Sequence, residues 1–214
     1  MGFLAHIFGG NQKKATHDPV SEAISLPGAA AASSKADSWY YPAGTDESVF
    51  RGPNGRPSIH AISYTDSTGE HVLRLVNVRT GLLIGPTDRR LPKLGLFVAQ
   101  LRGETHHQAA CRAGDFAPGA TLRLVLEPEN EHDPYAVAVF DSTGEHKAGY
   151  FNKQKARTVS RILAEGTTLN AVSFRGTPAN RRCDAVGVIA AESSLLAHVL
   201  APRPEQLPKP AHLR

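Results

Sequence analysis

Short stretches in which apolar and polar residues alternate recur along the chain between residues 59 and 190. Alternation with a period of two is typical of β-strands that bury one face. The stretches that show it are residues 59–64, 71–78, 94–101, 120–128, 135–141, 146–151, 169–176 and 185–190. The first two are joined by DSTGE, whose Asp and Gly suit a tight turn. The pattern predicts a mostly β protein.

The period changes to that of a helix in two segments of the second half. Within residues 152–166, four apolar residues recur at helical spacing: Ala156, Val159, Ile162 and Leu163. Asn152 can cap the start of this helix and Gly166 can end it. A second, short amphipathic helix is predicted at residues 192–200. Many short strands with one or two helices predict a small closed or partly closed β-barrel.

The composition divides the chain into four parts. Residues 1–38 are rich in Gly, Ala, Ser and Pro and are predicted to be a flexible linker. Residues 39–93 are predicted to be a small β-rich N-terminal extension of unassigned role, and residues 94–200 the barrel domain. Residues 201–214 contain four prolines and are predicted to be a basic, extended tail.

One six-residue sequence occurs twice. DSTGEH stands at residues 66–71 and again at residues 141–146, and residues 52–71 share eight identities with residues 127–146. A degenerate internal duplication would explain this similarity. Two hairpins that converged on one turn sequence would explain it as well, because the similarity stops after the turn.

Charge is balanced where the barrel is predicted. The whole chain has 24 Lys and Arg against 20 Asp and Glu, a formal net charge of +4. Residues 94–200 hold 11 residues of each sign, so an anion site there must come from local arrangement. The content of 41% apolar residues is enough for a core and excludes a wholly disordered chain.

Several classes of chemistry lack their sequence motifs. No Gly-rich loop ends in Lys-Ser or Lys-Thr, which excludes an ATP-driven motor in this chain, and no GxSxG elbow is present. Cys111 and Cys183 form no CxxC pair, and HExxH is absent, so no metal, cofactor or catalytic residue is expected. Enzymatic activity is left open, with a non-catalytic role favoured. The thiols are expected to be reduced in a cytoplasmic protein without a membrane span.

Three motifs follow one another in the second half of the chain. They are RGETHHQ at residues 102–108, EPENEHDPYAVAVF at residues 127–140 and AGYFNKQKA at residues 148–156. The middle motif combines a Pro-containing loop of acidic and Asn residues, an Asp, and a strand that begins with Ala-Val. Together the motifs resemble the HIRAN domain, which is attached to eukaryotic Snf2-type DNA helicases and also occurs alone in bacterial proteins. The resemblance covers about residues 94–192.

The resemblance implies a modified OB-like β-barrel that binds single-stranded DNA, in the best-understood members at a free 3′ end. There an aromatic pair stacks on the terminal bases, an Asp meets the terminal hydroxyl, and cations hold the phosphates. By position in the motifs, the aromatic pair falls on His106 and His107. The Asp falls on Asp133 and the residue before it on His132, and a cation falls on Lys153. Where Tyr is usual in the family, this chain has imidazoles, which can stack on a base and titrate near neutral pH.

The predicted helix at residues 152–166 indicates a phosphate site independently of the resemblance. Lys153, Arg157 and Arg161 recur every fourth residue and form one cationic ridge. The backbone amides behind Asn152, at the helix start, are a natural place for a phosphate. The alternative is that this ridge is an ordinary solvated surface.

The loop before the strand at residues 135–141 is unusually acidic for a binding site of this kind. Asp133 can accept a hydrogen bond from a sugar hydroxyl, which an uninterrupted strand would not present. Glu127, Glu129 and Glu131 would then discourage the threading of a continuous strand. Alternatively, these glutamates only solvate a turn framed by prolines.

The sequence leaves functions of other classes open. A protein-interaction or adaptor module could use the linker, residues 39–93 and the Pro-rich tail. A metal-dependent nuclease or hydrolase subunit would need carboxylates such as Glu104, Asp115 and Asp133 to converge, and a metal site could use His106, His107 and Cys111. In the favoured interpretation the partner is single-stranded nucleic acid, DNA in preference, and a separate helicase or nuclease supplies the enzymatic activity.

Overall fold

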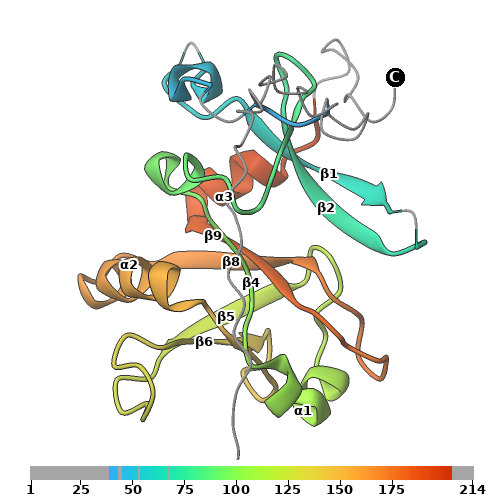
Figure 1. Ribbon diagram of the computed structural model, residues 1–214, viewed down its shortest axis with the longest axis vertical. Coiled ribbons are helices and arrows are strands. Elements are labelled where there is room, and N and C mark those ends of the chain that lie inside the picture. Colours follow the sequence, from blue (N-terminus) through green and yellow to red (C-terminus); the bar gives the residue numbers. More distant parts are fainter. Residues whose placement is uncertain (1–38, 43–44, 53, 67, 204–214) are drawn as a thin grey trace, which may run out of the picture. The chain divides into compact units, whose positions relative to one another are not determined.

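The computed structural model describes residues 39–42, 45–52, 54–66 and 68–203 (Figure 1). The linker predicted at residues 1–38, and the predicted tail from residue 204 onward, lie outside the described residues. In the part of the chain that is described, no helix is long and apolar enough to cross a membrane.

The described residues form strands, short helices and turns in the order that the apolar pattern indicates. The strands are β1 Ile59–Thr65, β2 His71–Asn77, β3 Leu83–Ile84, β4 Phe97–Gln100, β5 Thr121–Leu126, β6 Val137–Asp141, β7 Lys147–Tyr150, β8 Leu169–Arg175 and β9 Gly187–Glu192. The α-helices are α1 Gln108–Ala113, α2 Lys153–Ala164 and α3 Ser193–Leu200, and the 3-10 helices are η2 Glu47–Phe50, η3 Leu91–Leu94 and η4 Glu104–His106. The predicted mostly β fold class is confirmed.

The larger sheet curls into an OB-like half-barrel. Its strand order is β4-β9-β8-β5-β6-β7, and every pairing in it is antiparallel. Beyond the end of β4, Arg102 pairs with Tyr150 of β7, the strand at the other edge of the sheet. The backbone N–H of Arg102 donates to the Tyr150 carbonyl at 2.8 Å, and the Tyr150 N–H donates back at 2.9 Å. These two hydrogen bonds join the first and last strands, and the sheet curls back on itself.

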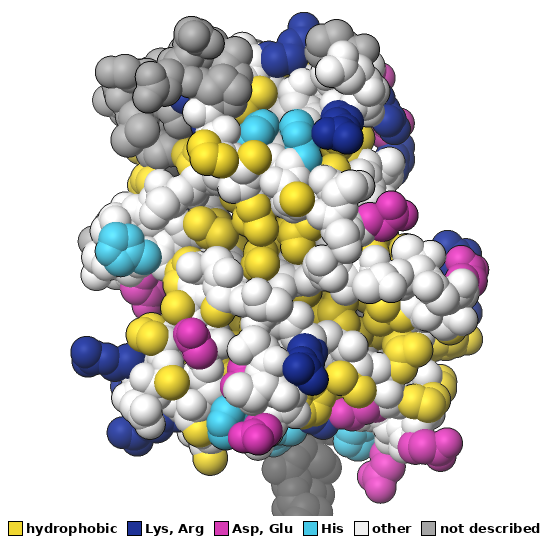
Figure 2. Space-filling view, turned by 180° about the vertical axis from the view of Figure 1, so that it is seen from behind, with side chains coloured by type: hydrophobic (Ala, Val, Ile, Leu, Met, Phe, Trp, Pro, Cys, Tyr) yellow, Lys and Arg dark blue, Asp and Glu magenta, His cyan; other side chains and the backbone are white. Residues whose placement is uncertain are grey.

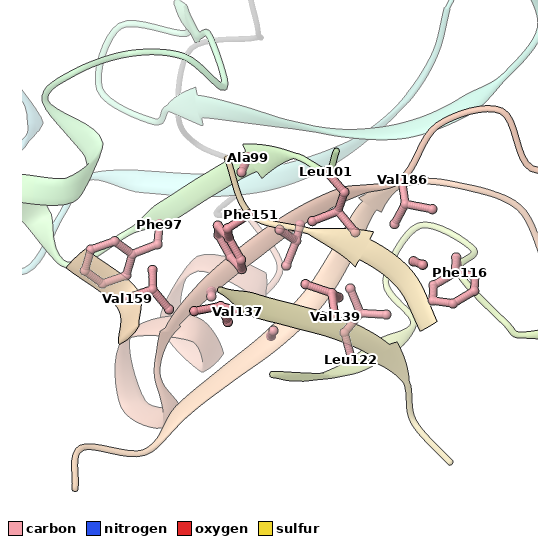
Figure 3. Packing of buried hydrophobic residues seen from close by; sticks show 14 of the residues in the cluster. Phe97, Ala99, Leu101, Phe116, Leu122, Val137, Val139, Phe151, Val159 and Val186 are labelled. Atoms are coloured by element: carbon pink, nitrogen blue, oxygen red, sulfur yellow. The ribbon is translucent and has the colours of Figure 1, made fainter. Parts of the chain in front are cut away.

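The interior of this barrel is apolar and closely packed (Figure 3). Phe97 and Leu101 enter it from β4 and the segment after it, and Phe116 and Val186 from the loops that lead to β5 and β9. Phe151, directly after β7, is only 4% exposed and belongs to this core.

Helix α2 covers one side of the barrel with the face that its apolar spacing predicts. Ala156 and Val159 are fully buried, while Ile162 and Leu163 pack partly against the core. The helix begins as expected, because the Asn152 side chain accepts a hydrogen bond from the Lys155 N–H at 3.1 Å.

The smaller sheet, in the order β1-β2-β3, shares a second apolar cluster with the barrel. Ile59 of β1 and Leu75 of β2 are buried in the same cluster as Ile189 of β9 and Leu196 of α3. A polar contact adds to this packing, since the His198 ring of α3 hydrogen-bonds to the carbonyl of Pro57, just before β1, at 2.7 Å. The predicted N-terminal extension therefore packs against the barrel over a common core.

Two segments differ from the prediction. The strand expected at residues 94–101 begins only at Phe97, because η3 extends to Leu94 and is capped by Gly95, whose φ is 79°. The sequence pattern predicts no helix after this strand, yet Glu104–His106 form η4 and Gln108–Ala113 form α1. Gly103, with a φ of 85°, turns the chain from the strand direction into these helical turns.

Both copies of DSTGEH form the turn of an antiparallel hairpin. In the first, the Asp66 carboxylate accepts hydrogen bonds from the backbone N–H groups of Thr68 and Glu70. In the second, the Asp141 carboxylate accepts hydrogen bonds from those of Gly144 and His146. In both turns the Asp carboxylate binds backbone N–H groups of the turn itself. This common structural role explains the shared sequence without a duplication.

The closure of the barrel depends on a glycine. A Cβ atom at Gly149, whose φ is 153°, would stand 2.6 Å from the Arg102 carbonyl oxygen. We expect Gly149→Ala to lower the free energy of unfolding in urea by more than about 2 kcal/mol, since backbone must move to relieve the contact. Gly166→Ala is the matched control, because Gly166 has a φ of 84° with nothing within 4 Å of the added atom. It should cost only about 1 kcal/mol, and equal losses in the two variants would contradict the steric argument.

Candidate nucleic-acid interface

A pocket of about 660 Å³ opens beside the closure of the barrel. Its walls come from the turn after β4, the loop between β5 and β6, and the junction between β7 and α2. We call it the histidine pocket; it is lined by Arg102, Gly103, His106, His107, Asn130, His132, Asp133, Ala136, Tyr150, Phe151, Asn152 and Lys153. Its volume is within the range of small-molecule sites.

The structure brings together most of the residues that the sequence nominates. Six of them line the histidine pocket: His106, His107, His132, Asp133, Asn152 and Lys153. They come from three segments that are far apart in the chain. The paired imidazoles and the carboxylate are therefore on the same side of the barrel.

The two neighbouring histidines differ in their surroundings. His106 is exposed at the end of η4, whereas His107 is half-buried and its ring centre lies 5.8 Å from that of Tyr150. Burial lowers the pKa of His107 from its ordinary value, and the nearby positive charges of Lys147 and His106 act in the same direction, against the carboxylate of Glu127. His107 is therefore largely neutral at pH 7 in the unbound protein.

The acidic loop is held in shape by one asparagine. The Asn130 side-chain oxygen accepts hydrogen bonds from the backbone N–H groups of His132, at 3.0 Å, and Asp133, at 3.3 Å. The Asp133 carboxylate in turn accepts one from the Tyr135 N–H at 2.9 Å through Oδ1. These short-range bonds fix the backbone that presents His132 and Asp133 to the pocket.

Glu127 has a specific structural role that the sequence did not indicate. Its carboxylate accepts a hydrogen bond from Lys147 Nζ at 2.6 Å through Oε1 and one from the Tyr150 hydroxyl at 2.8 Å through Oε2. Burial opposes ionisation of Glu127, but these two donors outweigh it and lower the pKa of the carboxyl. Glu127 thus holds Tyr150, the partner of His107, whereas Glu129 and Glu131 are exposed.

The start of α2 connects to the acidic loop. Lys153 Nζ lies 3.4 Å from the His132 carbonyl oxygen, a long hydrogen bond that still places its charge at the edge of the pocket. Arg102 is a second exposed cation in the pocket lining. The sequence analysis assigned no role to Arg102 or to the Asn130 side chain, although Arg102 opens the motif RGETHHQ and Asn130 lies within EPENEHDPYAVAVF.

The two arginines of the predicted cationic ridge do not line the histidine pocket. The Arg157 guanidinium lies 5.1 Å from the centre of the Tyr135 ring, and Arg161 pairs loosely with Glu165 at 3.9 Å. The ridge therefore continues along α2 beyond the pocket. Figure 2 shows Lys and Arg interspersed with Asp and Glu around one face of the molecule, with apolar side chains across its middle, so this face has no broad basic field among its described residues.

The metal-binding alternatives find little support in the geometry. Asp133 lines the histidine pocket, whereas Glu104 and Asp115 do not. Cys111 is the fully buried residue of α1. Among the described residues, no three His, Cys, Asp or Glu side chains are grouped so that they could hold a metal ion.

The contact between Glu127, Lys147 and Tyr150 predicts a pH dependence of stability. Because the folded-state pKa of Glu127 is below the value of about 4.3 for an unfolded chain, its contribution is complete above that pH and is lost as the pH falls through the folded-state pKa. We expect Glu127→Gln to lower the free energy of unfolding by about 1 kcal/mol at pH 7, and by much less at pH 3. Glu129→Gln, in the same loop, is the control. Urea titrations at the two pH values measure both, and a Glu127→Gln deficit that is unchanged at pH 3 would refute this account.

Comparison with known proteins bears on the same region. The structure of the HIRAN domain of human HLTF is 18% identical over 49% of this chain and 83% of that one, with a TM-score of 0.36. A protein from Lactobacillus plantarum is 14% identical over 44% of this chain and 92% of its own, also with a TM-score of 0.36. The structure of the HLTF HIRAN domain in its DNA-bound conformation is 16% identical over 49% of this chain and 82% of that one, with a TM-score of 0.33. No curated protein matches the chain.

A family model also matches the chain, in addition to these solved structures. The family model of the HIRAN domain matches residues 94–187. That span runs from the end of η3 to the first residue of β9 and contains every residue that lines the histidine pocket. It also contains the three motifs on which the resemblance rests. Residues 94–187 of this chain are a HIRAN domain.

Proposed function

We propose that this chain binds single-stranded DNA in the histidine pocket and receives the free 3′ end of the strand there. The observation that carries the proposal is the convergence of three imidazoles, one carboxylate and two cations on a single pocket of about 660 Å³. A pocket of this size accepts an unstacked nucleotide, whereas bases inside a duplex remain stacked.

The bases would stack on rings at one end of the pocket. His107 is backed by Tyr150, whose hydroxyl is fixed by Glu127, so this platform is rigid. His106 and His132 are exposed residues of the pocket lining, where they would add further ring contacts to a base. Base stacking tolerates any sequence, because every base has a π-face.

Asp133 would recognise the end of the strand. Its Oδ1 accepts the Tyr135 N–H, and an ionised carboxylate has further lone pairs to accept a hydrogen bond from a terminal hydroxyl. A strand that continued past this point would bring a phosphate, and no hydroxyl donor, against the carboxylate. Like charges at that distance repel, so an internal nucleotide is disfavoured there.

The phosphates would be held at the sides of the pocket. Lys153 and Arg102 are the exposed cations on its walls, and the first backbone amides of α2 lie beside Asn152. Lys147 is already paired with Glu127, so it serves the platform rather than the strand. Arg157 and Arg161 would contact only nucleotides farther from the end.

The family membership supports this function. The HIRAN domain of HLTF has been solved in a DNA-bound conformation, as the description of that structure states. The proposal for this chain also includes a cytoplasmic setting. It includes a separate helicase or nuclease as well, because the sequence has no motif for an ATP-driven motor.

An adaptor role is the second candidate, and one surface favours it. A pocket of about 650 Å³ between β5, β8 and α3 is lined largely by apolar side chains. Val125 and Leu200 in its lining are 41% and 37% exposed, which is unusual for large apolar residues. Binding of a protein there should be insensitive to salt, whereas nucleic-acid binding should weaken as salt rises.

Comparison of oligonucleotides with a free and a phosphorylated 3′ end tests the proposed function. We expect the wild-type chain to prefer the free hydroxyl by roughly tenfold, as one hydrogen bond to a charged group implies. Asp133→Asn should bring that ratio close to one, because it removes the charge that excludes a phosphate. Glu131→Gln, an exposed carboxylate of the same loop, should leave the ratio unchanged. Fluorescence anisotropy measures all of these affinities, and equal wild-type affinity for both ends would remove the end-reading role.

The imidazoles predict a pH dependence of binding. A DNA strand is negatively charged, so it favours the protonated form of any histidine beside it and raises that histidine's pKa. Affinity should therefore rise as the pH falls from about 7.5 to 6, since the unperturbed imidazole titrates near 6.5. The rise should be smaller in His107→Asn and intact in His71→Asn, which alters an exposed histidine of β2. Wild-type affinity that does not change over this range would count against histidine contacts with the strand.

A further inference from the structure

Two cysteines that are distant in the sequence meet inside the barrel domain. Cys111 belongs to α1, and Cys183 to the segment between β8 and β9. Their Sγ atoms are 3.2 Å apart, and both residues are buried. The function proposed above uses neither thiol.

The spacing of the sulfurs is unsuited to a shared metal ion. Two thiolates on a tetrahedral zinc ion, at about 2.3 Å each, are separated by roughly 3.8 Å. The described residues also offer no third ligand, because no group of three His, Cys, Asp or Glu surrounds this pair. The arrangement points instead to chemistry between the two sulfurs.

Access to the two sulfurs is unequal. Cys183 is 7% exposed and lines a pocket of about 630 Å³, together with Arg112 and the ion pair of Arg182 with Asp184. Cys111 is fully buried, with its Sγ 3.8 Å from the Ala148 carbonyl oxygen. A reagent in the pocket can therefore reach Cys183 first.

The surroundings of Cys183 favour the reactive thiolate. The hydrogen-bonding contact with the Cys111 thiol lowers the pKa of Cys183 to about 7; the Thr177 hydroxyl acts in the same direction, while burial and the charges of Asp184 and Glu104 oppose it. The same hydrogen bond, together with burial, raises the pKa of Cys111, so Cys111 keeps its proton until it reacts. A thiolate is the nucleophile in exchange reactions, so Cys183 is the attacking residue.

We propose that Cys111 and Cys183 form a reversible dithiol–disulfide pair that is oxidised by a small anionic disulfide such as oxidised glutathione. The Cys183 thiolate attacks one sulfur of that disulfide, forms a mixed disulfide, and releases one thiolate. This leaving thiolate takes the proton of Cys111. Cys111 then attacks Cys183 Sγ and releases the second small molecule as a thiolate, which takes up from water the equivalent of the proton that Cys183 lost when it ionised. The protein dithiol is oxidised, and one disulfide is reduced to two thiols.

The exposed Arg112, which lines the pocket at Cys183, suits an anionic reagent. Arg182 is already paired with Asp184 at 2.8 Å, so Arg112 is the main cation that remains for a carboxylate of glutathione. Reduction of the disulfide by the same class of small thiol reverses the reaction. The balance between the two forms then follows the redox state around the protein.

Closure of the disulfide would act on the histidine pocket, a step that rests on the proposed function. An S–S bond is about 2.05 Å long, so the sulfurs must approach by more than 1 Å from 3.2 Å. The Cys111 N–H donates to the His107 carbonyl at 2.8 Å, so a shift of α1 moves His107 relative to Tyr150. Oxidation should therefore weaken the binding of single-stranded DNA, by fivefold or more.

Thiol counting and mass measurement on the full chain test the chemistry. With oxidised glutathione, the wild-type chain should lose both thiols and two hydrogen atoms in mass, without forming dimers. Cys111→Ser should stop at one glutathione adduct, and Cys183→Ser should react far more slowly. A measurement on the wild-type chain does not depend on whether a variant folds. The rate of its alkylation by iodoacetamide should be half-maximal near pH 7. Persistence of both thiols, dimers as the main product, or equal reaction of the two variants would overturn the proposal.

The coupling to DNA is measured separately. Reduced and oxidised wild-type chains are compared with one single-stranded oligonucleotide, and a fivefold or larger loss on oxidation supports the coupling. Equal affinity of the two forms would overturn it. Absence of binding by the reduced chain would instead refute the proposed function, because the thiol measurements make no use of DNA.

Discussion

The pair of backbone hydrogen bonds between Arg102 and Tyr150 is the constraint on which the rest of the site depends. It joins the two edges of a sheet whose strands are otherwise paired with their neighbours, and it needs a glycine at position 149 for the backbones to approach. Both residues also line the histidine pocket. The same two residues thus close the fold and contribute to the lining of the site.

Acidic residues near this site have opposite uses. Glu127 turns inward and is neutralised by Lys147, which fixes the ring of Tyr150. Asp133 lines the pocket, with its carboxylate bound by the backbone N–H of Tyr135 in its own loop. A domain without net charge can therefore present a locally selective site, because the Glu127 carboxylate is bound by Lys147 and Tyr150 while the Asp133 carboxylate can still bind a ligand.

Local patterns in the sequence predicted most of the secondary structure, since alternation and helical spacing depend on neighbouring residues. The strands around Val137 and Val188 and the helix capped by Asn152 are examples. Helix α1 was missed because QAACRA is too short to show a period. The contact of Glu127 with Tyr150 and that of Cys111 with Cys183 join residues 23 and 72 positions apart, and no local pattern encodes such distances. The motifs of the HIRAN resemblance supplied the pocket residues that physical patterns alone left unassigned.

The common core between the small sheet and the barrel has a consequence for how the domain can be handled. Val98, Val172 and Ile189 face Ile59 and Leu75 across that core. A fragment cut at the start of the family match would leave these side chains in water, and such a surface promotes aggregation. Residues 39–93 thus cover this apolar surface of the barrel, and a fragment that is to stay in solution has to include them.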